Sequence, residues 1–367
     1  MLARKITLSN FRNIESATVS FHEGVNVLYG DNAQGKTNLL EALYYASIGK
    51  SFRGVHTAEL LRFGATESHI SFDFKAGERE QNLSFVLGNR VRSVFKNRVR
   101  LSKMSEMMGT FRAVLFCPEH LSLIKEGPAA RRQFLDIAIS AANPLYLGAL
   151  QRYHHVLKQR NALIKSAEND EKTVKNTIDI WSRQLADEGA LISAYRYQYV
   201  QNAAEHVKNC FTEMTGEREN PTLVYQGIWG REKDGYLDND KTAELLYHKL
   251  TENVAREIAA GMTLYGIQKD DVDVLLNDKS ARLYCSQGQQ RSLALALKIA
   301  EGELCFADCG EYPVLLFDDV LSELDKNRRE YLLSHIKGKQ VIMTTCEKEG
   351  VLAEHLILVK NGTFCEV

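Results

Sequence analysis

The sequence predicts a mixed α/β fold, in which an α/β core with a β-rich N-terminal part is interrupted by a mainly α-helical domain. Near the amino terminus, strand-like alternation leads into a glycine-bearing loop and then a helical pattern. The middle of the chain has only helical spacing, and after Gly288 helices and strands alternate again. We therefore expect residues 1–127 and 276–367 to form the core and residues 128–275 to form the helical insertion.

The overall charge of the chain is close to zero. Its 367 residues include 46 Lys and Arg against 47 Asp and Glu, which leaves a formal net charge of −1. This balance argues against a protein that coats nucleic acid through bulk positive charge, although it permits a local basic surface. No run approaches the roughly 20 apolar residues of a membrane-spanning helix, and the first residues lack the apolar segment of a signal peptide. We expect a cytoplasmic protein without a membrane partner.

The first part of the core is predicted to be rich in strands. Apolar and polar residues alternate from Ile6 to Leu8 and again from Val25 to Tyr29, which is the period of a β-strand. Similar patterns predict strands at His69–Phe74 and Asn82–Val86. Between Tyr29 and the next helical pattern lies a loop that contains two glycines.

The insertion is predicted to contain two long amphipathic helices. Leu150, Tyr153 and Leu157 recur at helical spacing, and a second set of apolar residues does so from Leu185 onward. The link Ser166–Lys172 is charged and has no apolar anchor, so we expect an exposed tip that joins two antiparallel helices. The pattern fits a projecting arm and a compact helical bundle equally well.

The glycine-bearing loop matches the phosphate-binding pattern G-x-x-x-x-G-K-[ST] at every position. In such a loop, successive backbone N–H groups surround phosphate oxygens at the positive end of a helix. Lys36 is expected to contact the β- and γ-phosphates of ATP during catalysis, and Thr37 is expected to bind Mg²⁺. The predicted nucleotide contacts are Gly30, Asp31, Asn32, Ala33, Gln34, Gly35, Lys36, Thr37 and Asn38.

A second part of the same site is predicted where the apolar strand Val314–Phe317 ends in two carboxylates. Asp318 is expected to bind Mg²⁺, and Asp319 is expected to orient or deprotonate the water that attacks the γ-phosphate. Paired aspartates in a loop are more often helix caps. The buried strand before them and the phosphate-binding loop favour the catalytic interpretation.

Two further segments resemble motifs of the ABC ATPase superfamily. Ser286 is a good N-cap for the helix that follows it, and Ser286-Gln287-Gly288-Gln289 resembles the signature motif. The resemblance implies that these four residues bind the γ-phosphate of ATP held by a second subunit. Leu321–Asp325 resembles the D-loop, which implies that Asp325 lies at such a composite site.

Two positions depart from the superfamily pattern. No histidine follows the strand Val341–Met343, and Thr345 stands at the place expected for the switch histidine. No glutamine follows Val114–Phe116, where Glu119 lies near the place of the usual glutamine loop. Whether Thr345 and Glu119 take over these roles is left open by the sequence.

Longer stretches of the chain resemble the RecF family of bacterial recombination mediators, which belongs to the SMC-like branch of the superfamily. The distance from Lys36 to Ser286 is 250 residues (286 − 36), whereas transporter ATPases place the signature much sooner. The stretches that carry the resemblance are Asn10–Asn13, Asn32–Ala42, Gly49–Arg53 and Ser286–Ser292.

The resemblance implies an ATP- and Mg²⁺-dependent homodimer that binds duplex DNA or gap junctions, hydrolyses ATP weakly, and acts with RecR and RecA in the repair of single-strand gaps. It also implies that Arg12 contacts the nucleotide and that Arg53 contacts DNA. The chain departs from the family at Gly266–Asp271, where Gly-Pro-His-Arg-Asp-Asp is usual. The alternative is the ATPase subunit of a membrane transporter, which the long insertion disfavours.

A candidate DNA-binding strip lies between Gly88 and Lys103, where the chain has no acidic residue. Basic residues fall on even positions and apolar residues mostly on odd ones, so two strands that turn near Asn97 are expected to have one basic and one apolar face. A solvated sheet face is the competing explanation. The residues of the predicted strip are Arg90, Arg92, Lys96, Arg98 and Arg100.

Overall fold

The computed structural model describes residues 1–89, 91–216, 219–230, 238–346 and 353–367. Its first compact unit consists of Met1–Leu121 and Leu297–Val367, and its second consists of Ser122–Ala296. The second unit is therefore longer at both ends than the expected insertion, 128–275. At its C-terminal end it includes Lys279–Ser280, because this short strand pairs with Asp271–Leu276 of the same unit.

One six-stranded sheet of the first unit has the order β15-β14-β3-β13-β12-β8. β15 is antiparallel to β14, and the other neighbours are parallel. All of β12 and most of β13 is buried, as expected for central strands of a parallel sheet. The strands are β3 (Val25–Tyr29), β8 (Ala113–Phe116), β12 (Val314–Asp318), β13 (Val341–Thr345), β14 (His355–Lys360) and β15 (Thr363–Glu366).

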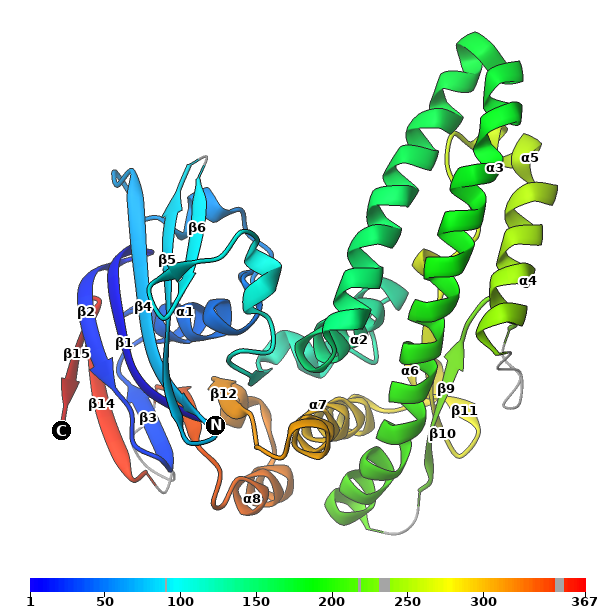
Figure 1. The fold of residues 1–367 in the computed structure, drawn as a ribbon. Coiled ribbons are helices and arrows are strands. Elements are labelled where there is room, and N and C mark those ends of the chain that lie inside the picture. Colours follow the sequence, from blue (N-terminus) through cyan, green and yellow to red (C-terminus); the bar gives the residue numbers. More distant parts are fainter. Residues whose placement is uncertain (90, 217–218, 231–237, 347–352) are drawn as a thin grey trace. The chain divides into compact units, whose positions relative to one another are not determined.

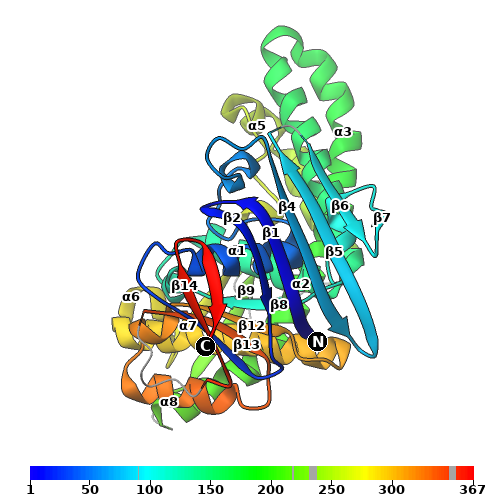
Figure 2. The same ribbon diagram turned by 90° about the vertical axis from the view of Figure 1, so that its left-hand side faces the viewer.

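The other sheet of the first unit is antiparallel, with the order β2-β1-β4-β5-β6-β7. Helix α1 (Lys36–Ile48) packs against both sheets in one apolar core (Figure 2), which joins Leu43 of α1 to Phe85 and Leu316. The mixed α/β fold and the predicted strands are thus confirmed. The strands of this sheet are β1 (Leu2–Phe11), β2 (Ile14–Ser20), β4 (Glu67–Ala76), β5 (Arg79–Gly88), β6 (Arg92–Lys96) and β7 (Val99–Arg100).

The hairpin of β6 and β7 does not have the register that the alternation suggested. Phe95 pairs with Arg100 and Lys96 pairs with Val99, so the turn contains only Asn97–Arg98. Both turn residues have positive φ, as two-residue hairpin turns require. Because paired residues of antiparallel strands point to the same face, this turn places even positions of β6 with odd positions of β7.

The basic residues of this hairpin are consequently divided between its two faces. Arg92 and Lys96 lie on the face of the buried Val94, whereas Arg100 lies on the opposite face. The predicted single basic face is therefore wrong, because periodicity along the chain does not define the register across a turn. Arg90 lies outside the described residues.

Helix α3 (Pro144–Thr215) is the longest element of the second unit. It is continuous in hydrogen bonding but turns back on itself, so that its two limbs run antiparallel (Figure 1). Arg152 donates to Glu188 at 2.9 Å, and Arg160 donates to Ser182 at 3.1 Å, across the two limbs. The predicted antiparallel pair is confirmed, although helical structure continues through Ser166–Lys172. We call residues 144–167 the first limb of α3 and residues 172–215 its second limb.

Smaller elements complete both units. In the second unit, α4 packs against α3, and a three-stranded sheet has the order β11-β10-β9. Within the described ranges, none of the helices combines the length and the hydropathy that crossing a membrane requires. The remaining elements are α2 (Pro128–Ala142), α4 (Asn239–Glu252), α5 (Val254–Ala260), α6 (Ala281–Tyr284), α7 (Gln287–Cys309), α8 (Lys326–His335), β9 (Pro221–Gln226), β10 (Asp271–Leu276) and β11 (Lys279–Ser280).

Two buried arginines of α3 hold the second unit together. Arg160 forms an ion pair of 2.6 Å with Glu257, and both side chains are fully buried. Arg196 contacts Asp136 at 2.8 Å and Asp270 at 3.2 Å. Desolvation raises the pKa of Asp270 to about 6, although the Arg196 charge acts in the opposite direction. A buried charge that loses its partner is costly, so these contacts fix the geometry of the unit.

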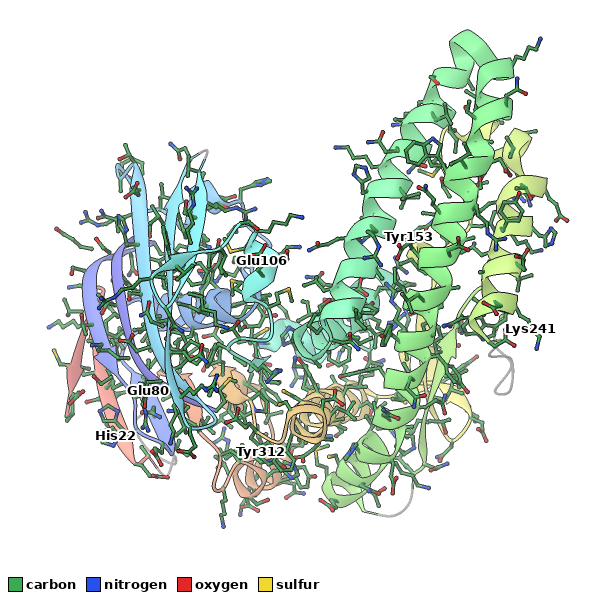
Figure 3. The ribbon with its side chains drawn as sticks, viewed as in Figure 1. His22, Glu80, Glu106, Tyr153, Lys241 and Tyr312 are labelled. Atoms are coloured by element: carbon green, nitrogen blue, oxygen red, sulfur yellow. The ribbon has the colours of Figure 1, made fainter. Side chains whose placement is uncertain are left out.

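The segment Gly266–Asp271, which departs from the family pattern, makes structural contacts within the second unit. Asp271 accepts two hydrogen bonds from Arg131, at 2.8 and 2.9 Å. Gly266 has a φ of +129°, and a Cβ atom there would lie 2.2 Å from the hydroxyl of Tyr153, a residue of the first limb of α3 (Figure 3). Glycine is therefore required at this position.

Candidate nucleotide-binding site

The predicted phosphate-binding loop lies between β3 and α1, both in the first unit. Gly30 has a φ of +148°, and a Cβ atom there would lie 2.4 Å from the carbonyl oxygen of Val359 on β14. Ala33 also has positive φ, and Gly35 occupies the left-handed N-cap position of α1. This backbone brings the loop to the N-terminus of α1, where free N–H groups favour an anion.

The side chain of Lys36 folds over its own loop. Its Nζ donates to the carbonyl oxygens of Gly30 at 2.5 Å and Asp31 at 2.8 Å. The thiol of Cys346, just after β13, lies 3.6 Å from the same nitrogen. The ammonium group is thus positioned over the loop, where a phosphate would meet a positive charge.

The carboxylate of Asp318 meets the loop at the carboxyl end of β12. Thr37 Oγ1 donates to Asp318 Oδ1 at 2.7 Å, and Thr344 Oγ1 donates to the same oxygen at 2.9 Å. Asp318 and Thr344 are neighbours in the parallel register of β12 and β13. No sequence motif singles out Thr344, because only the register of β12 and β13 brings it beside Asp318.

The environment of Asp318 disfavours its ionised form. Desolvation is the largest cause that raises the pKa of Asp318, and the nearby Glu119 carboxylate acts in the same direction. Hydrogen bonds from Thr37 and Thr344, together with the charge of Arg53, oppose this shift. A divalent cation at this position would restore the charge of the carboxylate.

Asp319 has an uncommon backbone conformation next to Asp318. Its φ is 51° and its ψ is 24°, in the left-handed region, where aspartate is among the tolerated residues. It occupies the N-cap position of the short helix Val320–Glu323, but its side chain makes no capping hydrogen bond. In the described part of the chain, its carboxylate has no hydrogen-bond partner, so the helix-cap explanation does not account for this residue.

Other contacts fix the outside of the loop. Gln34 accepts a hydrogen bond from the backbone N–H of Asn361 at 2.7 Å, and its carbonyl oxygen accepts one from Gly362 at 2.8 Å. Asn38, on α1, donates to Asn13 at 2.8 Å. Asn32 accepts a contact of 2.9 Å from the Cys346 thiol. These partners are distant in sequence, which is why motif analysis alone missed them.

Arg12 is bound to a buried acid on the helix that follows the loop. Its guanidinium makes two hydrogen bonds to Glu41, at 2.7 and 2.9 Å, and Glu41 is fully buried. Arg53 lies 3.6 Å from the same carboxylate and donates to Asn38 at 3.0 Å. Ser51 also donates to Glu41. Glu41 therefore joins Arg12, predicted to contact nucleotide, to Arg53, predicted to contact DNA.

The signature segment forms a capping box at the start of α7. The backbone N–H of Gln289 donates to Ser286 Oγ at 3.2 Å, and the backbone N–H of Ser286 donates to Gln289 Oε1 at 2.8 Å. The predicted N-cap role of Ser286 is confirmed. Ser286 and Gln287 are exposed, and Gly288 is half-buried in the first turn of the helix. This helix start belongs to the second unit.

The remaining predicted positions have local partners. Asp325 caps α8 by accepting a hydrogen bond from the backbone of Arg328 at 3.0 Å. Thr345 lies in β13 opposite Tyr29. Cys346, rather than Thr345, is the residue beside Lys36. Glu119 is exposed in the short helix Pro118–Ser122 and lies near enough to influence Asp318.

Comparison with known proteins places this site in a family. The RecF/RecN/SMC N-terminal domain matches residues 2–361. The DNA replication and repair protein RecF of Ruminiclostridium cellulolyticum is 38% identical over 351 residues, which are 95% of this chain and 94% of that protein. RecF of Bacillus mycoides is 36% identical over 100% of this chain and 99% of its own length.

Solved structures agree with this placement. The recombination mediator protein RecF of the RecFOR pathway, solved with ATP, matches with a TM-score of 0.94 and 33% identity, over 100% of this chain and 97% of that one. The Smc head domain of Pyrococcus furiosus matches with a TM-score of 0.58 and 15% identity, over 100% of this chain and 96% of that one, and shows a shared fold only. The chain therefore belongs to the RecF family of the RecF/RecN/SMC group.

Proposed function

We propose that this chain is an ATP-switched DNA-binding protein of recombinational repair, in which ATP closes a homodimer on DNA and weak hydrolysis reopens it. The observation that carries the proposal is the contact of 2.7 Å between Thr37 on the phosphate-binding loop and Asp318 at the end of β12. Two parts of the chain 281 residues apart thus meet at one site. The ATP-bound RecF structure supports ATP as the ligand.

The residues at this site fit Mg²⁺ together with a nucleotide. Thr37 and Asp318 supply oxygen donors, which Mg²⁺ prefers. Among the described residues, no group of three or more His, Cys, Asp and Glu side chains could hold a metal. Mg²⁺ typically completes its coordination with substrate phosphates and water, so a two-residue site is sufficient. When bound, the ion would neutralise charge on the β- and γ-phosphates.

The protein's own groups perform the remaining steps of the proposed mechanism. Loop N–H groups and Lys36 bind and orient the phosphates. The free carboxylate of Asp319 orients the attacking water and accepts its proton. Thr344 holds Asp318 in place, and Cys346 lies beside Lys36, one residue after Thr345, which stands at the place expected for the switch histidine. With Asp in place of a stronger base, we expect slow hydrolysis.

Closure of the dimer is proposed to depend on the exposed start of α7. Ser286, Gln287 and Gly288 would bind the γ-phosphate of ATP in the partner subunit, because a helix N-terminus favours an anion. Gln289 and Asp325 have structural capping roles and would support this surface. To change closure from 1:99 to 99:1, ATP must favour the closed form by about 5.5 kcal/mol.

The DNA partner is proposed to be duplex or a gap junction, with RecR and RecA acting in the same pathway and in the cytoplasm. The relatives' names as DNA replication and repair proteins support this assignment. Arg53, Arg92, Lys96, Arg98 and Arg100 stay candidate DNA contacts, although they do not form one face. No observation favours the alternative of a transporter ATPase.

The proposal is tested by sedimenting the protein with gapped DNA, with and without ATP and Mg²⁺. We expect ATP-dependent retention on DNA, and we expect Lys36→Met to abolish it because phosphate binding loses its positive charge. Lys326→Met is the matched control, since Lys326 is 85% exposed and forms only a surface ion pair. Equal retention by Lys36→Met in the presence of ATP would refute the role of the loop.

A further inference from the structure

The first limb of α3 carries only basic charges. No Asp or Glu occurs from residue 144 to residue 167, whereas this limb contains four Lys and Arg and two His. Arg160 is buried against Glu257, and Arg152 is paired with Glu188 on the second limb. The other basic residues of the limb, all exposed, are His154, His155, Lys158 and Lys165.

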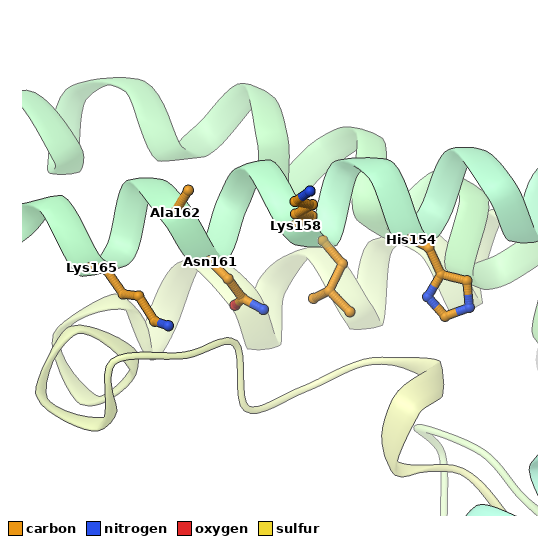
Figure 4. Close-up of a pocket in the computed structure, with 6 residues that line it drawn as sticks. His154, Lys158, Asn161, Ala162 and Lys165 are labelled. Carbon is orange, nitrogen blue, oxygen red and sulfur yellow. The ribbon is translucent and has the colours of Figure 1, made fainter. Parts of the chain in front are cut away.

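Three of these residues form a row on one face of the helix. His154, Lys158, Asn161 and Lys165 follow the spacing i, i+4, i+7 and i+11, which places them on one side. They line a hollow of about 420 Å³ together with Leu157 and Ala162 (Figure 4). We call His154, Lys158 and Lys165 the α3 basic stripe. At 1.5 Å per residue, the stripe is about 16 Å long.

No acidic residue of the neighbouring segment neutralises the stripe. The chain at 261–269 lies alongside, because the backbone N–H of Thr263 donates to Asn161 Oδ1 at 2.8 Å. This segment contains no Asp or Glu and has one further base, Lys269. Within the described ranges, Lys158 and Lys165 form no ion pair. Lys158 and Lys165 therefore keep their positive charges available to an external anion.

We propose that the α3 basic stripe binds the phosphate backbone of duplex DNA. This inference rests on the proposed function and adds to it a contact surface in the second unit. A row of basic side chains about 16 Å long, two of them lysines, fits the regularly spaced phosphates of a DNA strand. A protein partner is disfavoured because protein interfaces have an apolar and aromatic centre, whereas Leu157 is the one large apolar side chain among the described residues that line this hollow.

The contact would be independent of base sequence and sensitive to salt. Each phosphate that a basic residue neutralises contributes about 0.9 to the slope of log affinity against log salt concentration. The double variant Lys158→Gln, Lys165→Gln should therefore lower that slope by about 1.8 in the presence of ATP and Mg²⁺. The slope is measured with a fluorescent duplex at several salt concentrations.

The matched control is the double variant Lys208→Gln, Lys249→Gln, which removes two exposed charges from the same unit that do not belong to the stripe. Trp181 and Trp229 both lie in the second unit, so unchanged tryptophan fluorescence verifies its folding. A stripe variant with the slope and affinity of the parent chain would overturn this inference alone. A parent chain that binds no duplex would overturn the proposed function as well. Unchanged DNA binding combined with weaker retention on polyglutamate would assign the stripe to an acidic protein.

Discussion

Glu41 connects several of the residues that surround the nucleotide site. Its fully buried carboxylate receives two hydrogen bonds from Arg12 and one from Ser51, and Arg53 lies 3.6 Å away. It is on α1, whose first residue is Lys36. A displacement of this carboxylate would therefore be transmitted both to the phosphate-binding loop and to the segment that carries Arg53.

Replacement of Glu41 by Ala should destabilise the first unit by about 3 kcal/mol, because removal of one partner from a buried ion pair leaves the other uncompensated. The measurement is the free energy of opening of β12, obtained from amide hydrogen exchange. Glu15→Ala is the matched control, since Glu15 pairs with Arg62 at 2.9 Å but is 73% exposed. We expect the control to cost less than about 1 kcal/mol. Equal costs for both variants would contradict the structural role of Glu41.

Local sequence patterns correctly predicted those helices, strands and loops that depend only on neighbouring residues. The loop between β3 and α1, the buried strand β12 and the cap at Ser286 each depend on neighbouring residues, and each is present. The prediction of a single basic face on the β6–β7 hairpin was wrong. The two-residue turn pairs even positions of β6 with odd positions of β7, so the basic residues are divided between the two faces. Contacts such as Thr344 with Asp318 depend on strand register across the sheet, which no local pattern contains.

The short helix Pro118–Ser122 gives the first unit a predicted pH dependence. Desolvation, followed by the charge of Lys298, lowers the pKa of His120 from 6.5 to about 3, and its Nδ1 lies 3.0 Å from the Leu115 carbonyl oxygen. The pKa of His120 is lower in the folded chain than in the unfolded chain. The stability that neutral His120 contributes to the folded state is therefore complete above pH 6.5 and is lost as the pH falls towards 3.

When the pH is lowered from 7.5 to 5.5, the free energy of unfolding of the parent chain should therefore fall by about 1.4 kcal/mol more than that of His120→Gln. Hydrogen exchange of β12 at both pH values measures the difference, since β12 pairs with β8 directly before this helix. His155→Gln, at an exposed position, should behave like the parent chain. A His120→Gln variant that loses as much stability as the parent would show that His120 is protonated in the folded protein.

The net charge of the whole molecule is −1, but its acidic and basic residues are distributed unevenly along the chain. The first limb of α3 has no acid, while the acids of this long helix follow residue 167. A protein of this kind can bind DNA only where basic surfaces are presented together. This fits the proposed conditional binding, in which ATP would bring two copies of the chain to one duplex. If this proposal holds, the proposed dimer surface at Ser286 is the decisive position for the mechanism.

Replacement of Ser286 by Arg should prevent ATP-dependent dimer formation but leave ATP binding to the monomer intact. Because ATP binding to the monomer is measured separately, an effect on dimers alone would indicate that Ser286 acts on the ATP of the partner. Light scattering with ATP and Mg²⁺ measures the dimer, and binding of a fluorescent ATP analogue measures the monomer site.

The effect of losing the helix cap must be separated from the expected block of dimer formation. Ser286→Ala removes the hydrogen bond from Gln289 and should cost about 1 kcal/mol, as Ser286→Arg does, but it adds no bulk or charge to the surface. We therefore expect Ser286→Ala to dimerise more readily than Ser286→Arg at equal thermal stability. Ser16→Arg, at an exposed position on β2, controls for added charge. Because all three variants retain the loop around Lys36, a normal dimer formed by Ser286→Arg would mean that ATP closes the molecule through a different surface.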